Sequence, residues 1–209
     1  IHNLTGKVLG FGGRIIKTET KAPKYINSPE TAVYEKRKVL YGLYQAKNAI
    51  RKFDLCYVVE GYMDVISLSQ AGIENVVAVS GTAFTEEQAR LLKRFAPEVV
   101  LLFDGDEAGV NASLKHINTL LKADVNTRVV LFPKDEDPDS YVQKHGKEGF
   151  DAFVLEQAKD FIGLIAEVKM RGEDAIAKAT AGRMMAESIA QIPDPLKRAA
   201  FINEAAQLL

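Results

Sequence analysis

Residues 55–64 read Leu-Cys-Tyr-Val-Val-Glu-Gly-Tyr-Met-Asp. The first five are apolar throughout, which is typical of a strand buried on both faces inside a parallel sheet. Two acids, Glu60 and Asp64, follow directly where such a strand would end. Because ligand sites in open α/β sheets lie at the carboxyl ends of the strands, this stretch predicts both the fold class and the edge that carries the chemistry.

The same alternation continues toward the carboxyl terminus. Segments with helical periodicity separate further short apolar runs, and one of these helices begins with a capping box, Thr85-Glu-Glu-Gln88. This order predicts an α/β fold with a mostly parallel sheet and helices on both faces. We expect strands at 55–59, 76–79, 99–103 and 129–132, and helices at 64–71, 85–95 and 108–121.

The flanking segments predict a partial basic α+β subdomain before the sheet and a small helical bundle after it. The pair Gly12-Gly13 predicts the turn of a β-hairpin, and the prolines of 21–30 predict an exposed loop. The expected elements are hairpin strands at 7–11 and 14–18, a helix at 31–52, helices at 150–158, 161–171 and 174–191, and a last helix begun by Asp194 and Pro195. We therefore expect three domains, at 1–53, 54–146 and 147–209.

The composition indicates an ordinary globular protein, since 47% of the 209 residues are hydrophobic and 26% are charged. The sequence contains neither an apolar run of about 18 residues nor a signal peptide, so we expect a cytoplasmic chain, and a fragment of a longer one. The single cysteine, Cys56, lies in an apolar run, and the three histidines lack ligand spacing. These observations exclude internal disulfides and cysteine-based zinc sites, and any metal must be held by oxygen.

The net charge of −1 hides a strong asymmetry along the chain. Residues 1–52 contain 11 basic and 3 acidic residues, a net charge of +8, whereas the remainder contains 16 basic and 25 acidic residues, a net charge of −9. A basic front joined to an acidic body predicts that one part holds a polyanion and the other holds metal. A basic surface that is merely solvated is the competing interpretation.

Acids stand directly after three of the four predicted strands. Because parallel strands bring these loops to one edge, we expect their carboxylates to converge, and a hard divalent cation would relieve their repulsion. Gly61, Gly105 and Gly109 would let backbone and substrate approach closely. The six acids are Glu60, Asp64, Asp104, Asp106, Asp137 and Asp139.

Other interpretations of these acids compete with a metal site. Any one of them could be a helix cap, and for Asp64 the two interpretations are balanced. An EF-hand fails, because the loop that begins at Asp104 would need an acid at Ala108 and a glutamate at Lys115. A receiver domain with one phosphorylatable aspartate is also a poor fit to Asp104-Gly-Asp106.

The pairing of Val58-Val-Glu-Gly-Tyr-Met-Asp64 with Phe103-Asp-Gly-Asp-Glu-Ala-Gly109 resembles the Toprim signature of bacterial primases, topoisomerases and some nucleases. The flanks narrow the resemblance to the catalytic core of DnaG-type bacterial primases, over about residues 3–150. The matching segments are Phe11-Gly-Gly-Arg14, Pro23-Lys-Tyr-Ile-Asn-Ser-Pro-Glu-Thr31, Leu40-Tyr-Gly-Leu-Tyr44 and Glu136-Asp-Pro-Asp139.

The resemblance implies DNA-directed synthesis of RNA primers on single-stranded DNA by metal-dependent nucleotidyl transfer. It implies that Mg²⁺, for which Mn²⁺ can substitute, binds to Glu60, Asp104, Asp106, Asp137 and Asp139, with Glu60, Asp104 and Asp106 catalytic and Asp64 and Gly61 in support. It further implies that nucleotide or template contacts Arg14, Lys24, Tyr25, Asn27 and Lys36.

The same resemblance implies what lies outside this sequence. The zinc-binding module of the family is missing, so no zinc is expected here, and the replicative helicase would bind a further module that is also missing. The expected partners are single-stranded DNA and ribonucleoside triphosphates at the bacterial replication fork, with no membrane. Two alternatives stay open: another Toprim enzyme that cleaves DNA, of the topoisomerase or nuclease type, and a non-catalytic module that binds single strands.

Overall fold

The structure is a computed structural model that describes residues 1–14, 25–79, 84–104, 107–170 and 174–209. Within these ranges, five strands form the main sheet in the order β3-β5-β4-β6-β7. The strands β4, β5, β6 and β7 are parallel to their neighbours, whereas β3 pairs antiparallel with β5. The strands are β3 (Leu40–Tyr41), β4 (Leu55–Val59), β5 (Val76–Val79), β6 (Glu98–Phe103) and β7 (Asn126–Leu131). The predicted α/β class with a mostly parallel sheet is confirmed.

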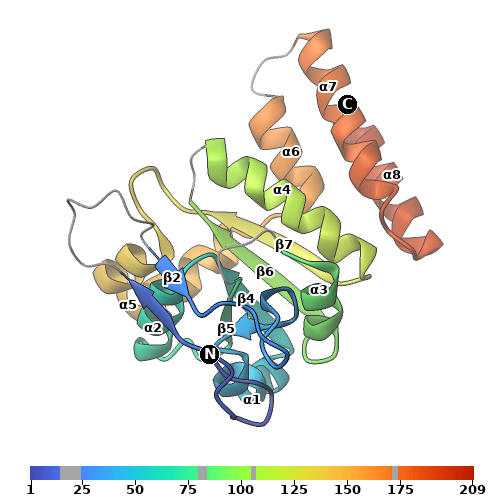
Figure 1. Cartoon of the computed structure of the whole chain (residues 1–209). Helices are drawn as coiled ribbons and strands as arrows, with labels where there is room; N and C mark the ends of the chain where they lie inside the picture. The colour runs from blue at the N-terminus through green and yellow to red at the C-terminus, as the bar shows by residue number, and fades with distance from the viewer. Residues whose placement is uncertain (15–24, 80–83, 105–106, 171–173) are drawn as a thin grey trace.

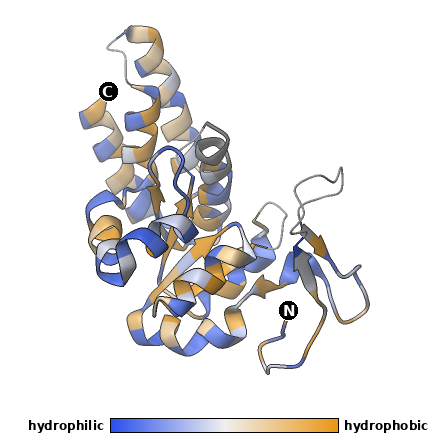
Figure 2. Ribbon diagram, turned by 90° about the vertical axis from the view of Figure 1, so that its left-hand side faces the viewer, coloured by the Kyte–Doolittle hydropathy of each residue, from blue (hydrophilic) through white to orange (hydrophobic). Residues whose placement is uncertain are grey.

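Both faces of the sheet are buried. Side chains alternate along each strand, so that Val58 and Leu101 join one apolar cluster while Val59 and Leu102 join the other. The first cluster is covered by α1 (Leu43–Phe53), α3 (Glu86–Lys93) and α4 (Glu107–Lys122), and the second by α2 (Tyr62–Gln70) and α5 (Pro138–Gln157). Figure 2 shows the apolar strands enclosed by helices with hydrophilic outer faces. This double burial explains why the strands are uniformly apolar in sequence.

The last part of the described chain is helical, as predicted. Helices α6 (Phe161–Lys169), α7 (Ala175–Ile189) and α8 (Pro195–Leu208) each begin after an aspartate whose side chain accepts backbone N–H bonds. Figure 1 shows them beyond α4, with α7 and α8 projecting from the sheet. The side chains of Phe161 and Ile165 pack in the cluster that also contains α4, which fixes α6 against the sheet.

The segment before α6 differs from the prediction. Instead of a helix at 150–158, α5 begins at Pro138 and is interrupted at Gly146, where φ is +67°. After α5, Lys159 forms a two-bond bridge with Val129 on β7, with N–O distances of 2.7 and 2.9 Å. Asp137 and Asp139 therefore lie at the start of a helix rather than in a loop.

The predicted helix at 31–52 is wrong in its first half. The helix α1 begins at Leu43, after Gly42, whose φ of +83° lies in the left-handed region. The preceding residues form a 3₁₀ turn, η1 (Lys36–Lys38), and the edge strand β3. Pairing of Leu40 with Val79 decided the conformation here, and that tertiary contact has no signature in the local sequence.

The predicted hairpin is also wrong in its register. The glycines of the pair Gly12-Gly13 lie within a strand, β1 (Gly12–Arg14), rather than in a turn. This strand pairs antiparallel with β2 (Tyr25–Asn27), which lies in the segment predicted as a loop. The predicted strand at 14–18 falls mostly outside the described residues.

In the described parts of the chain, no helix is long and apolar enough to cross a bilayer.

Candidate active site

The carboxyl ends of β4 and β6 bring Glu60 and Asp104 to the same edge of the sheet. The two strands run parallel, with Val58 opposite Leu101, and each acid follows the last residue of its strand. Both side chains are exposed. The neighbouring β7 ends at the same edge, since the Phe132 N–H donates to the Phe103 carbonyl at 2.9 Å. The predicted convergence of the loops on one edge is therefore present for these strands.

Asp137 and Asp139 occupy the start of α5. Asp137 is the N-cap, and its Oδ1 accepts the Ser140 N–H at 2.7 Å while its own N–H donates to Ser140 Oγ at 2.9 Å. Asp139 lies in the first helical turn, where its Oδ1 accepts a hydrogen bond from Gln143. The capping interpretation thus holds for Asp137, whose second carboxylate oxygen is not needed for that bond.

Asp64 is the acid of this edge whose pKa is affected by the other carboxylates. Its Oδ2 accepts the Gly61 N–H at 3.1 Å, and the side chain is half-buried. Burial, followed by the carboxylates of Asp137, Asp139 and Asp104, raises the pKa of Asp64 to about 7, although the Gly61 bond opposes the shift. Four of the six predicted acids therefore interact electrostatically, and a bound cation would relieve the repulsion between their carboxylates.

The remaining metal-site predictions stay untested. Asp106 lies outside the described residues, so its position relative to Asp104 is not given. Among residues 1–14, 25–79, 84–104, 107–170 and 174–209, no group of three or more acidic, histidine or cysteine side chains is close enough together to hold a metal ion. In the described part of the chain, the acids share an edge without forming a ready coordination shell.

Tyr62 links the basic front to this acidic edge. Its hydroxyl donates to Asn27 Oδ1 at 2.7 Å, and its ring lies 4.3 Å from that of Tyr41, measured between centroids. The backbone of Gly12 comes so close that a Cβ there would lie 2.6 Å from Cε2 of Tyr62. Through these contacts the hairpin of β1 and β2 touches the start of α2. The glycine that was predicted to form a turn instead allows the hairpin to approach the site.

The structure describes only some of the residues that were predicted to contact nucleotide or template. Arg14 ends β1 and is exposed, Asn27 ends β2, and Lys36 begins η1. Tyr25 is described by its backbone alone, and Lys24 lies outside the described residues. Tyr62 was missed as a site residue, although its place between Glu60 and Asp64 in the sequence could have indicated it.

Comparison with known proteins identifies the family. A family model described as the N-terminal domain of the DNA primase catalytic core matches residues 1–47, and one described as Toprim-like matches residues 57–142. The solved catalytic core of E. coli primase is 36% identical, with a TM-score of 0.87 over 100% of this chain and 68% of that one. The chain belongs to the DnaG-type bacterial primases.

Two further relatives support this membership. The DNA primase of Clostridium acetobutylicum is 40% identical over 98% of this chain and 34% of its own length. A solved DnaG primase catalytic domain is 36% identical, with a TM-score of 0.85 over 99% of this chain and 68% of that one. The chain thus spans about a third of that curated primase, within its catalytic core.

The contact between Tyr62 and Asn27 gives a testable prediction for this primase core. Tyr62→Phe removes the hydroxyl while keeping the ring against Tyr41, so we expect the free energy of unfolding to fall by about 1 kcal/mol, the contribution of one hydrogen bond. Asn27→Ala should destabilise the protein by a similar amount, and the double variant should be no less stable than the less stable single variant. Denaturant unfolding checks this, and strictly additive losses would contradict it.

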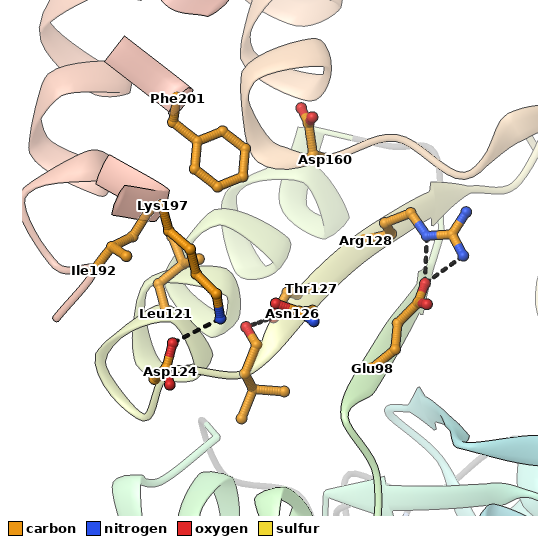
Figure 3. A pocket seen from close by; sticks show the side chains of 11 residues that line it. Glu98, Leu121, Asp124, Asn126, Thr127, Arg128, Asp160, Ile192, Lys197 and Phe201 are labelled. Carbon is orange, nitrogen blue, oxygen red and sulfur yellow. Dashed lines mark hydrogen bonds and ion pairs between the residues drawn. The ribbon is translucent and has the colours of Figure 1, made fainter. Parts of the chain in front are cut away.

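A cavity of about 280 Å³ lies at the opposite end of the primase sheet (Figure 3). It adjoins Glu98 and Asn126, which begin β6 and β7, and is covered by Phe201 of α8. Two ion pairs join residues that line the cavity, one between Arg128 and Glu98 and the other between Lys197 and Asp124. Because β6 is six residues long, the cavity is separated from the acidic edge by about 20 Å of strand, and it marks the packing of the helical bundle rather than the site.

Proposed function

We propose that this chain synthesises RNA primers on single-stranded DNA by metal-dependent nucleotidyl transfer. The observation that carries the proposal is that two features meet at one edge of the sheet. The first is the set of interacting carboxylates around Asp64, and the second is the hairpin of the basic front, which Tyr62 attaches beside them. A primer-synthesising site needs both, because the reacting triphosphate is itself an anion that must be held close to metal. Membership of the DnaG-type primases supports the choice of reaction.

The donor set fits a hard divalent cation such as Mg²⁺, with Mn²⁺ as a substitute. Carboxylate oxygens are the ligands that Mg²⁺ accepts. Burial is the main cause of the raised pKa of Asp64, and the neighbouring carboxylates add to it with negative charge that such an ion would offset. The residues that would hold it are Glu60, Asp104, Asp106, Asp137 and Asp139. When bound, the ion supplies charge neutralisation for the triphosphate and lowers the pKa of the attacking 3′-hydroxyl.

The chain's own residues would divide the remaining work. Glu60 and Asp104, which follow the last residues of buried strands, would present their carboxylates from fixed positions while substrate binds. Arg14, Lys24 and Lys36 would bind phosphates of nucleotide or template, and Tyr25 and Asn27 would contact bases. The solved DnaG catalytic domain mentioned above was determined bound to single-stranded DNA, which supports a template of that kind here.

The place of action, the helicase partner and the role of Asp64 belong to the same proposal. The chain would act at the bacterial replication fork, as one part of a longer primase. A replicative helicase would be reached through a separate module of the whole protein. Asp64, held by Gly61, would support the acids around it rather than bind the nucleotide.

The proposal is tested by incubating the protein with single-stranded DNA, labelled ribonucleotides and Mg²⁺. New RNA that depends on template and on the metal is the expected product, and EDTA should abolish it. Nicked template without RNA would instead indicate a cleaving Toprim enzyme. Single-strand binding without any turnover would indicate a non-catalytic module.

The basic residues give a quantitative prediction. Each lysine that contacts template phosphate releases condensed counterions, so Lys36→Ala should reduce the salt slope for single-stranded DNA by about 0.7 if Lys36 serves the template. If Lys24 serves the triphosphate, Lys24→Ala should raise the nucleotide KM and leave that slope unchanged.

Anisotropy at several salt concentrations, with EDTA present, measures the slopes, and steady-state kinetics gives the KM. Lys122→Ala, at the end of α4 away from the hairpin, is the charge-matched control. If the Lys36 and Lys24 variants match this control in slope, affinity and KM, the basic front is only a solvated surface.

A further inference from the structure

Gln88 in the first turn of α3 is a fully buried amide, with an exposed fraction of 0%. Its Oε1 accepts the Thr85 N–H at 3.0 Å, which completes the capping box of α3. Its Nε2 donates to two carbonyls outside the helix, those of Lys36 at 3.2 Å and Val39 at 2.8 Å. A capping box explains the first bond but not the other two.

The two donated bonds hold both ends of η1. Lys36 begins this turn and Val39 follows it, so one amide group spans the turn. A third bond comes from the same helix start, since Thr85 Oγ1 donates to the Arg37 carbonyl at 2.6 Å. Because a 3₁₀ turn of three residues has little stability of its own, these outside bonds decide its conformation.

η1 lies at the edge of the sheet that carries the acids. It directly precedes β3, in which Leu40 pairs with Val79, the last residue of β5. Because β5 runs parallel to β4, the end of β5 lies at the same edge as Glu60. The backbone of Lys36 is therefore held at the carboxyl edge of the sheet.

The start of α3 is itself fixed to the sheet. Ala89 and Leu92 are buried in the core beneath it. Directly before the N-cap residue Thr85, the Phe84 N–H donates to Nε2 of the buried His116 at 3.4 Å. The His116 ring packs against Phe103, which directly precedes Asp104, at 5.2 Å between centroids. Through these contacts the donors of Gln88 keep a fixed position relative to the acidic edge.

We propose that Gln88 is a positioning residue for nucleic-acid chemistry, which uses its two N–H donors to hold the η1 turn so that Lys36 presents its ammonium group to phosphate at the acidic edge. This inference rests on the proposed function, in which Lys36 binds phosphate of nucleotide or template. A purely structural amide would stabilise the fold equally but would not act through Lys36.

Gln88→Glu is the sharpest test, because the ionised glutamate keeps the acceptor for Thr85 and loses both donors. Gln88→Met, which is uncharged and similar in length, serves if the glutamate variant does not fold. Gln70→Glu, at the exposed end of α2, introduces the same charge elsewhere, and Leu92→Val perturbs α3 without touching the amide.

Two measurements decide the outcome. Hydrogen exchange of peptides that cover 36–41 should be faster in the Gln88 variants than in either control. Affinity for ATP and for a labelled single strand, with EDTA present, should fall about fivefold to tenfold for whichever ligand Lys36 serves. The double variant with Lys36→Ala should lose no more affinity than Lys36→Ala does.

Unchanged exchange at 36–41, or additive losses in the double variant, would overturn the positioning role while leaving the proposed function intact. Faster exchange in a protein whose parent binds neither ATP nor single strands would overturn the proposed function, and the positioning role of Gln88 with it.

Discussion

Replacing Asp104 or Glu60 by alanine is expected to reduce template-directed RNA synthesis at least about 100-fold, the scale of removing one preorganised electrostatic group from a transition state. The fold should remain intact, because both side chains are exposed at the ends of strands that are buried by other residues. Without metal, Asp104→Ala also removes one of the carboxylates that raise the pKa of Asp64. Its free energy of unfolding in EDTA should therefore stay equal or increase.

Primer synthesis assays and thermal melts in EDTA check both parts. Glu156→Ala, on the exposed surface of α5 away from the edge, is the matched control and should change neither. Full activity in either site variant would refute the assignment of that acid. A large loss of stability would show instead that the carboxylate is needed for folding.

Asp64→Asn is expected to stabilise the metal-free protein at pH 8 and to have little effect at pH 4. The pKa of Asp64 rises from its ordinary value of 3.8 to about 7 in the folded chain. Between these values the folded state binds a proton that the unfolded state has lost, so the free energy of unfolding falls as the pH rises through this window. Asparagine has no such titration and still offers an oxygen to the Gly61 N–H.

The stabilisation at pH 8 should be about 2–4 kcal/mol. Denaturant unfolding in EDTA at several pH values measures it, with Glu156→Gln as a control that removes one exposed charge. Parallel curves for the parent and Asp64→Asn would show that Asp64 is ionised without cost. We also expect Mg²⁺ to stabilise the parent more than Asp64→Asn at pH 8, because the ion offsets the same repulsion.

The sheet could be predicted because its information is local. The runs at Leu55–Val59 and Val76–Val79 are apolar throughout, and they agree with β4 and β5 residue for residue. Thr85 and Gln88 likewise form the predicted capping box. A strand buried on both faces needs uniform apolarity, so composition alone locates it.

The errors fall where distant contacts decide the conformation. Leu40 fits a helical spacing, yet it pairs with β5, and Gly12 fits a turn, yet it packs against Tyr62. Gln88 was recognised as part of a capping box, whereas its bonds to Lys36 and Val39 span about 50 residues. Such contacts depend on the assembled fold and leave no periodicity in the sequence.

The acidic edge and the repulsion between its carboxylates could be predicted, but not which acid has the raised pKa. The order of strands and acids indicated that Glu60 and Asp104 would share an edge, which they do. The half-burial of Asp64, which makes it the acid with the raised pKa, depends on how α2 packs beside α5. No local pattern separates Asp64 from an ordinary helix-capping aspartate.

The two margins of the sheet bear on whether a second chain could add a strand to it. On one side β3 offers just two residues, and on the other the bridge between Lys159 and Val129 occupies backbone groups on the outer side of β7. Long margins with unpaired N–H and C=O groups are templates on which a second chain can add a strand. With one margin shortened and the other partly covered, the described sheet presents little template for such growth.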